Sequence, residues 1–214
     1  MLELQHVRKF YNPRLVLEIP LLRLEKGIYW LKGVNGSGKT TFLKMVTGLL
    51  PFEGEISFDA VSLKKSPLAY RRMISWAEAE PLFPEFMTGI EMLLLYKDIR
   101  GAKREEIDQL ITSFGLNDYV SNPIGTYSEG MRKKLSLSLA FVGHPSLIAL
   151  DEPFITLDTN SVVYIRQLIT DTFKNKGTTF LVSSHHDPGA GELKTGRELI
   201  AQNQTISIAH ESAA

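Results

Sequence analysis

The sequence predicts an α/β fold with a mainly parallel sheet and an inserted helical subdomain, and two patterns indicate it. Short apolar runs typical of strands recur along the chain, and several are nearly continuous hydrophobics, as expected of strands covered on both faces. Helical patterns lie between some of these runs, which favours parallel strands joined by helices. From Thr88 to Val142 the patterns are helical only. We therefore expect one domain over residues 1–214, with a core of about 1–80 and 145–214 and a helical subdomain of about 81–144.

The strands and helices of the core can be placed one by one. Strand-like runs lie at residues 2–7, 28–31, 55–58, 74–77, 147–150, 179–183 and 205–208. Two helices are predicted where apolar side chains repeat along one helical face: Phe42, Met45, Val46 and Leu49, and then Ile165, Leu168, Ile169, Thr172 and Phe173.

The helical subdomain begins at a clear helix start. Thr88 and Glu91 have the spacing of a capping box, in which each side chain satisfies a backbone amide of the other residue. Two further helices are predicted by their apolar stripes: Ile107, Leu110, Ile111 and Phe114, and then Met131, Leu135, Leu139 and Val142. Residues 211–214 have the character of a frayed tail.

Composition and charge exclude several classes of partner. Lysine plus arginine and aspartate plus glutamate are balanced at 24 each, so we expect no binding to nucleic acid. The chain contains no cysteine, which excludes disulfides and thiolate metal sites. Its apolar runs are shorter than the roughly 20 residues that span a bilayer, and we expect no secretion signal at the first residues. Any work at a membrane must therefore depend on another chain.

The most specific motif lies between a predicted strand and a predicted helix. Residues 33–40 fit the phosphate-loop pattern G-x-x-x-x-G-K-[ST], and its strand–loop–helix context is the expected one. Backbone amides of such a loop surround phosphates at the positive end of the helix. We expect Lys39 to reach the β- and γ-phosphates and Thr40 to bind Mg²⁺. The candidate nucleotide-binding residues are Gly33, Val34, Asn35, Gly36, Ser37, Gly38, Lys39, Thr40 and Thr41.

A pair of acids supplies the complementary half of this chemistry. The apolar run at 147–150 ends in Asp151 and Glu152. We expect Asp151 to hold the Mg²⁺ ion through water and Glu152 to polarise the attacking water. The alternative is that the acids merely end a strand that Pro153 terminates.

With these motifs in this order, the chain resembles the nucleotide-binding subunits of ABC transporters over nearly its whole length. The resemblance implies a P-loop NTPase fold with a RecA-like core and N-terminal antiparallel strands, and hydrolysis of ATP with Mg²⁺. Tyr11 stands where the family has the aromatic residue that stacks on adenine, although a surface tyrosine beside a turn is the alternative.

Residues 127–131 stand where the family has its signature Leu-Ser-Gly-Gly-Gln. Ser128 and Gly130 are retained, and the resemblance implies that they bind the γ-phosphate of ATP held by a second subunit. Glu129 replaces a glycine and brings negative charge near that phosphate. Ser128 could instead be an ordinary helix N-cap.

Two further positions follow from the resemblance. Asp158 matches the residue that crosses the dimer interface, although it could equally cap a helix. His185 matches the switch histidine that contacts the γ-phosphate and orients the lytic water, with a solvent-facing side chain as the alternative.

The segment joining the core to the helical subdomain departs from the family pattern. The family's glutamine falls on Ala79, which has no side-chain oxygen for Mg²⁺ or water. Glu78 or Glu80 could substitute, the linker could transmit motion without touching the metal, or both acids could simply be solvated. An apolar cluster follows, which either the core or a membrane subunit must cover: Leu82, Phe83, Phe86 and Met87.

The favoured function is therefore the ATP-hydrolysing subunit of an ABC transporter. The expected partners are transmembrane permease subunits and a second ABC ATPase, identical or different, in a head-to-tail dimer. The expected location is the cytoplasm, at the inner face of the cell membrane, and export is favoured over import. The alternatives are a soluble ABC-type ATPase not attached to a transporter and a P-loop kinase, which would not need residues 127–131, Asp158 or His185.

Overall fold

The computed structural model describes residues 1–184 and 196–209. Its elements follow in this order: β1 (Leu2–Tyr11), β2 (Arg14–Leu24), β3 (Ile28–Lys32), α1 (Lys39–Val46), β4 (Glu53–Phe58), β5 (Val61–Ser62), α2 (Pro67–Met73), β6 (Ile74–Ala77), α3 (Gly89–Arg100), α4 (Arg104–Ser113), a 3₁₀ turn η1 (Ile124–Thr126), α5 (Glu129–Phe141), β7 (Leu147–Leu150), α6 (Thr159–Lys176), β8 (Thr179–Ser183), β9 (Arg197–Gln202) and β10 (Thr205–Ile208).

The strands form two sheets. The larger has the order β10-β9-β3-β8-β7-β6, in which only β10 runs antiparallel to its neighbour among the described strands. The smaller is antiparallel, with the order β2-β1-β4-β5. This arrangement confirms the predicted mainly parallel sheet with antiparallel strands near the N-terminus.

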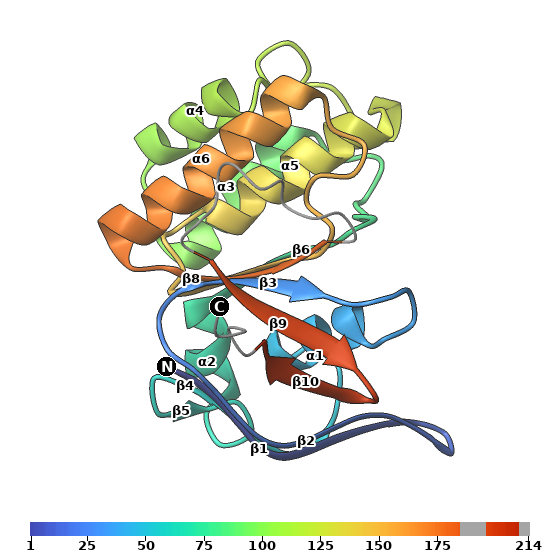
Figure 1. The fold of residues 1–214 in the computed structure, drawn as a ribbon. Coiled ribbons are helices and arrows are strands. Elements are labelled where there is room, and N and C mark those ends of the chain that lie inside the picture. The colour runs from blue at the N-terminus through green and yellow to red at the C-terminus, as the bar shows by residue number, and fades with distance from the viewer. Residues whose placement is uncertain (185–195, 210–214) are drawn as a thin grey trace.

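The larger sheet separates two hydrophobic cores (Figure 1). On one face, α3, α4, α5 and α6 cover the sheet, and Ile28 and Trp30 of β3 point into this core. On the other face, α1 lies between the two sheets and packs against Tyr29 and Leu31 of the same strand. Alternate residues of β3 thus serve opposite cores, as the pleat of a strand covered on both faces requires.

The helical layer begins as predicted. Thr88 Oγ1 accepts a hydrogen bond from the Glu91 amide at 3.3 Å, and the Glu91 carboxylate accepts one from the Thr88 amide at 2.8 Å, which completes the capping box. At the other end of α3, Arg100 donates to the carbonyl of Ile74 at 2.8 Å and so ties this helix to the start of β6. The division at residues 81 and 144 stays a prediction.

One predicted helix is shorter than expected, and several elements were not predicted. We expected Leu49 on the helical face of Phe42, but α1 ends at Val46 and the side chain of Leu49 is exposed. Gly48 causes this ending, because its φ of 74° is a left-handed conformation that a helix cannot continue through. The unpredicted elements are β2, β5, β9, α2 and the 3₁₀ turn η1. The predicted frayed tail lies outside the described residues.

Candidate active site

The phosphate loop connects the end of β3 to the start of α1, as its motif predicts. Two glycines are required by their surroundings. A Cβ on Gly33 would lie 2.6 Å from the carbonyl oxygen of Ala201, and Gly38 precedes α1 with a φ of 100°. The loop therefore turns tightly against β9 before its backbone enters the helix, and the N-terminal amides of α1 are left at the mouth of the cavity.

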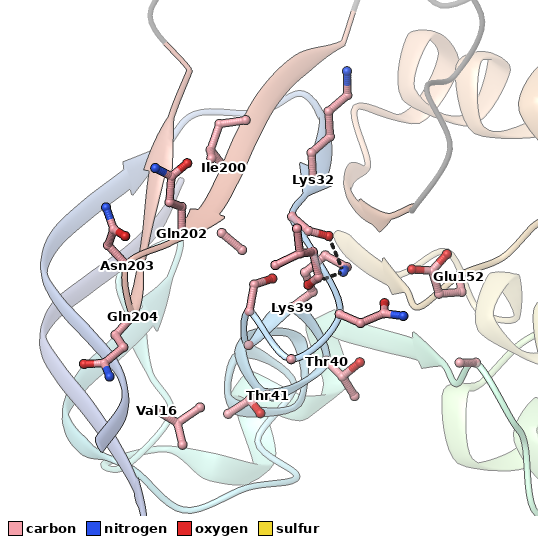
Figure 2. A pocket seen from close by; sticks show the side chains of 18 of the residues that line it. Val16, Lys32, Lys39, Thr40, Thr41, Glu152, Ile200, Gln202, Asn203 and Gln204 are labelled. Carbon is pink, nitrogen blue, oxygen red and sulfur yellow. Dashed lines mark hydrogen bonds between the residues drawn. The ribbon is translucent and has the colours of Figure 1, made fainter. Parts of the chain in front are cut away.

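Lys39 curls back over this loop. Its ammonium donates hydrogen bonds to the carbonyl oxygens of Gly33 at 2.7 Å and Val34 at 3.3 Å (Figure 2). Burial lowers the pKa of Lys39, while the nearby carboxylates of Glu152 and Asp151 act in the opposite direction. A buried cation at the positive end of a helix is well suited to meet polyphosphate oxygens.

The end of β7 brings Asp151 to Thr40. Thr40 Oγ1 donates to Asp151 Oδ2 at 2.8 Å, and Ser183 Oγ donates to Asp151 Oδ1 at 2.6 Å. Asp151 is nearly fully buried, so these hydroxyls both satisfy and orient its carboxylate. Ser183 was not predicted as a site residue, because its only signal in the sequence is a hydroxyl at the end of an apolar strand.

Glu152 adopts an unusual backbone conformation directly after β7. Its φ of 46° is left-handed, which is uncommon for a residue other than glycine. Its amide donates to Ser183 Oγ at 2.9 Å, which holds this turn in place. The side chain lines the same cavity as Lys39, and in Figure 2 it stands on the opposite side of Lys39 from Gln202 and Asn203.

The cavity has a volume of about 1070 Å³, enough for a nucleotide. Tyr11, at the end of β1, lines it with an exposed side chain, and the Lys9 ammonium lies 4.9 Å from the tyrosine ring. The turn between β9 and β10 forms the far wall, a contribution that the sequence analysis missed: Gln202, Asn203 and Gln204. Nothing in the sequence links this polar turn to a loop about 170 residues earlier.

The structure brings together all of the predicted loop residues, Tyr11, Asp151 and Glu152, but not three other predicted positions. Ser128, Gly130 and Asp158 do not line this cavity among the described residues. His185 lies outside the described residues.

Ser128 and Asp158 are both helix caps in the structure. Ser128 Oγ accepts from the Met131 amide at 3.3 Å at the start of α5. Asp158 caps α6 by accepting from the Ser161 amide at 2.8 Å, and it pairs with Lys134 at 3.0 Å. The hydroxyl and amide of Ser161, together with the Lys134 ammonium, hold the pKa of Asp158 well below its usual range.

In the linker after β6, the two acids that could substitute for the absent glutamine, Glu78 and Glu80, lie in different surroundings. The Glu78 carboxylate pairs with Lys44 of α1 at 2.7 Å, and both side chains are about one-third exposed. Ala79 and Glu80 line the nucleotide cavity.

Behind the linker lies Lys133, a buried lysine of α5 that the sequence analysis did not single out. It is 1% exposed, and its ammonium donates to the carbonyl oxygens of Glu78 at 2.8 Å, Ala79 at 3.0 Å and Asp151 at 3.0 Å. Burial lowers the pKa of Lys133 to about 8, an effect that the surrounding carboxylates oppose.

Comparison with known proteins identifies the family to which this site belongs. A family model described as "ABC transporter" matches residues 22–155, which is more than half of the chain. The chain belongs to the family of ABC transporter ATP-binding subunits. As a member of it, this ATP-binding subunit binds and hydrolyses ATP to power transport, and the predicted family and reaction are confirmed.

Individual relatives agree with this assignment. The subunit is 30% identical over 187 residues to the lantibiotic transport ATP-binding protein SrtF of Streptococcus pyogenes, covering 86% of this chain and 80% of that protein. It is 34% identical over 171 residues to the ABC transporter ATP-binding protein NatA of Bacillus subtilis, covering 77% and 69% of the two chains.

Solved structures confirm the predicted P-loop NTPase fold. The structure of an ATP-binding subunit of an ABC transporter superposes with a TM-score of 0.88 at 27% identity, covering 98% of this chain and 89% of that one. A dimeric ATP-binding cassette in a post-hydrolysis state, bound to ADP and Pi, has the same fold, with a TM-score of 0.83 at 20% identity and coverage of 99% and 100%.

Proposed function

We propose that the cavity binds ATP with its phosphates on residues 33–41 and its adenine against Tyr11. The observation that carries this proposal is the chain of contacts from Thr40 through Asp151 to Ser183 and Glu152, because it joins the phosphate loop to two acids. Lys39 would leave the carbonyls of the loop and bind the β- and γ-phosphates, since charge-assisted bonds to phosphate are stronger than bonds to neutral carbonyls.

The residues around Thr40 fit a Mg²⁺ ion. The Thr40 hydroxyl and the Asp151 carboxylate are hard oxygen donors that already lie 2.8 Å apart. Mg²⁺ keeps several waters and typically takes few protein ligands together with substrate phosphates. Within residues 1–184 and 196–209 no group of three or more acids or histidines gathers around a metal position, which suits that mode of binding. When bound, the ion would neutralise charge that develops on the phosphate oxygens.

Glu152 would act as the general base. Its carboxylate lines the cavity beside the loop, where it can accept a proton from the water that attacks the γ-phosphorus. At Glu152 the left-handed backbone turns away from the direction of β7, and the hydrogen bond from its amide to Ser183 holds this turn. His185 would assist by orienting the same water.

The test is a pair of substitutions with a matched control. Glu152→Gln should keep ATP affinity, measured by calorimetry, and lose at least about 10²-fold in phosphate release, the usual scale for loss of a general base. Lys39→Ala should abolish nucleotide binding. Glu105→Gln, an exposed acid of α4 away from the cavity, should change neither quantity. Undiminished phosphate release by Glu152→Gln would remove Glu152 from its role.

We further propose that the subunit acts in a head-to-tail dimer, with itself or with a second ABC ATPase. Ser128 and Gly130 do not line their own chain's cavity among the described residues, so a contact with ATP would come from a partner molecule. Asp158 would lie at the same interface. The solved dimeric cassette bound to ADP and Pi supports this arrangement by its shared fold.

The membrane partners are proposed to be permease subunits. No helix in the described part of the chain is long and apolar enough to cross a bilayer. In the apolar cluster after the linker, Leu82 is 91% and Phe86 is 84% exposed, whereas Phe83 and Met87 pack against the helical core. The exposed pair is therefore the surface we assign to a permease subunit at the inner face of the cell membrane. The likeness to a lantibiotic transport ATP-binding protein supports a role in transport, and we propose export as the direction.

A further inference from the structure

We propose that Lys133 is a positioning residue that ties the linker at Glu78 and Ala79 to the end of β7 at Asp151, so that these segments move together when ATP is bound. This inference rests on the proposed roles of Asp151 and Glu152. The side chain of Ala79 cannot connect the linker to the residues proposed to hold Mg²⁺. Lys133 of α5 would make this connection instead.

The linker's own side chains are poorly placed for this connection. Ala79 lines the cavity but carries no polar side-chain atom. The Glu78 carboxylate is paired with Lys44 on α1, on the phosphate-loop side. The linker does, however, present backbone carbonyls, and two successive ones, of Glu78 and Ala79, accept hydrogen bonds from Lys133.

The third contact of Lys133 is with the residue that directly follows β7. Lys133 also donates to the carbonyl of Asp151, the residue whose carboxylate meets Thr40 at 2.8 Å. An ammonium group has three N–H donors, and the three carbonyls match that number. One side chain thus joins the end of β6 and the end of β7 to α5, the helix that Ser128 caps.

Burial of Lys133 makes the loss of any of these hydrogen bonds costly. Lys133 is 1% exposed and so shielded from bulk solvent, and moving either strand end away from it would leave a buried charge partly unsatisfied. The surrounding carboxylates add attraction, and they come from the linker, β7 and α5: Glu78, Glu129, Asp151 and Glu152. The linker and the acids are therefore expected to shift as one unit.

A second cation offers a matched control. Arg100 of α3 donates to the carbonyls of Ile74 at 2.8 Å and Arg72 at 3.3 Å, at the opposite end of β6. It is also a tie from the helical layer to this strand, but it does not line the nucleotide cavity. Its loss should therefore lower stability without altering the arrangement of the acids.

The first experiment separates turnover from binding in the purified chain. Lys133→Met should lower kcat for phosphate release about 10-fold or more, because misplaced catalytic groups lose rate steeply, while ATP affinity by calorimetry stays within about twofold. Lys133→Arg, which keeps charge and donors, should recover most of the lost kcat. Arg100→Met should lower the Tm and leave kcat within about twofold. Equal effects of Lys133→Met and Arg100→Met on kcat and Tm would reduce Lys133 to a structural role.

The second experiment measures the coupling itself by hydrogen–deuterium exchange with and without MgATP. In the wild type, ATP should slow exchange in peptides from the phosphate loop and from the linker. In Lys133→Met, the phosphate loop should still respond and the linker should not. A linker that responds normally in this variant would overturn the proposal. If Lys133→Met does not fold, Lys133→Gln removes the charge and enters the same comparison.

The two proposals fail in different ways. If Glu152→Gln retains full phosphate release, the proposed role of Glu152 as general base is wrong. If Glu152→Gln is inactive while Lys133→Met has normal kcat and a normal linker response, the inference about Lys133 alone is wrong.

Discussion

The hydroxyl of Ser183 meets two functional groups at once. It donates to Asp151 Oδ1 at 2.6 Å and accepts from the Glu152 amide at 2.9 Å. A hydroxyl has one donor and two acceptor sites, so one small side chain can orient a carboxylate and a strained backbone turn together. Ser183 belongs to β8, and the pairing of β8 with β7 therefore positions both acids.

We predict that Ser183→Ala lowers both activity and stability. Asp151 would lose one of its two hydroxyl partners and the Glu152 amide its acceptor, which is expected to cost about 1–3 kcal/mol in free energy of unfolding. Phosphate release should fall by about 10-fold or more, since both acids would lose their orientation. Ser138→Ala is the control, because that buried hydroxyl donates within α5, to the carbonyl of Leu135. Normal turnover with Ser183→Ala would contradict this account.

Among the elements, α6 shows how one residue can serve two purposes. Asp158 caps the helix through Ser161 and pairs with Lys134 of α5. The cap fixes the direction in which α6 leaves the segment after β7, and the ion pair connects that segment to α5, which Ser128 caps. The two roles considered for Asp158, cap and interface residue, therefore remain compatible.

The lowered pKa of Asp158 predicts how the stability of the protein depends on pH. Because the folded pKa lies below the unfolded value of about 3.9, the carboxylate stabilises the protein above that pH, and the stabilisation is lost as the pH falls below it. Asp158→Asn should lower the Tm at pH 7, and the deficit should shrink as the pH falls from 4 toward 3. Asp171→Asn, on the same helix away from its start, should barely change the Tm. A deficit from Asp158→Asn that is as large at pH 3 would contradict this prediction.

The elements that the sequence predicts are those with a strong local pattern. The fully buried β7 and β8 and the capped α3 were predictable because apolar runs and a capping box leave a clear pattern. The strand β2 was missed because exposed and charged residues along it, among them Glu18 and Arg23, interrupt the apolar pattern. In the site, the phosphate loop and Asp151 follow from a motif. Lys133 and Ser183 could not be predicted, because contacts with backbone carbonyls and amides of distant segments follow no residue pattern.

At the scale of the whole molecule, we predict a dimer that depends on nucleotide. Glu152→Gln should be monomeric at 24.0 kDa without ATP and should double in mass with ATP and Mg²⁺, because hydrolysis can no longer reopen the interface. Light scattering measures this directly. Adding Gly130→Asp should keep ATP binding and abolish the dimer. A Glu152→Gln monomer at saturating MgATP and high concentration would indicate that a different cassette is the required partner.

The exposed apolar pair after the linker gives a prediction for transport. Leu82→Ser with Phe86→Ser should abolish binding to the permease and transport while ATP affinity and Tm are retained, since both side chains are largely exposed. Phe83→Ala with Met87→Ala is the contrasting pair, which packs on the helical core and should lower the Tm. Copurification with the permease and thermal unfolding separate the two outcomes. Normal transport by the Leu82 and Phe86 variant would exclude this surface.

The order of strands in the larger sheet also determines when the protein becomes competent during its synthesis. The phosphate loop is encoded early, yet β3, which supports it, is flanked by β8 and β9, with Ile28 opposite Phe180 and Tyr29 opposite Arg197. When the ribosome has synthesised the loop, α1 and the whole helical layer, β3 therefore still lacks both of its neighbouring strands. Pairing over such long sequence separations is slow. The nascent chain is thus expected to acquire nucleotide affinity abruptly and late, when β8 and β9 emerge and insert on either side of β3.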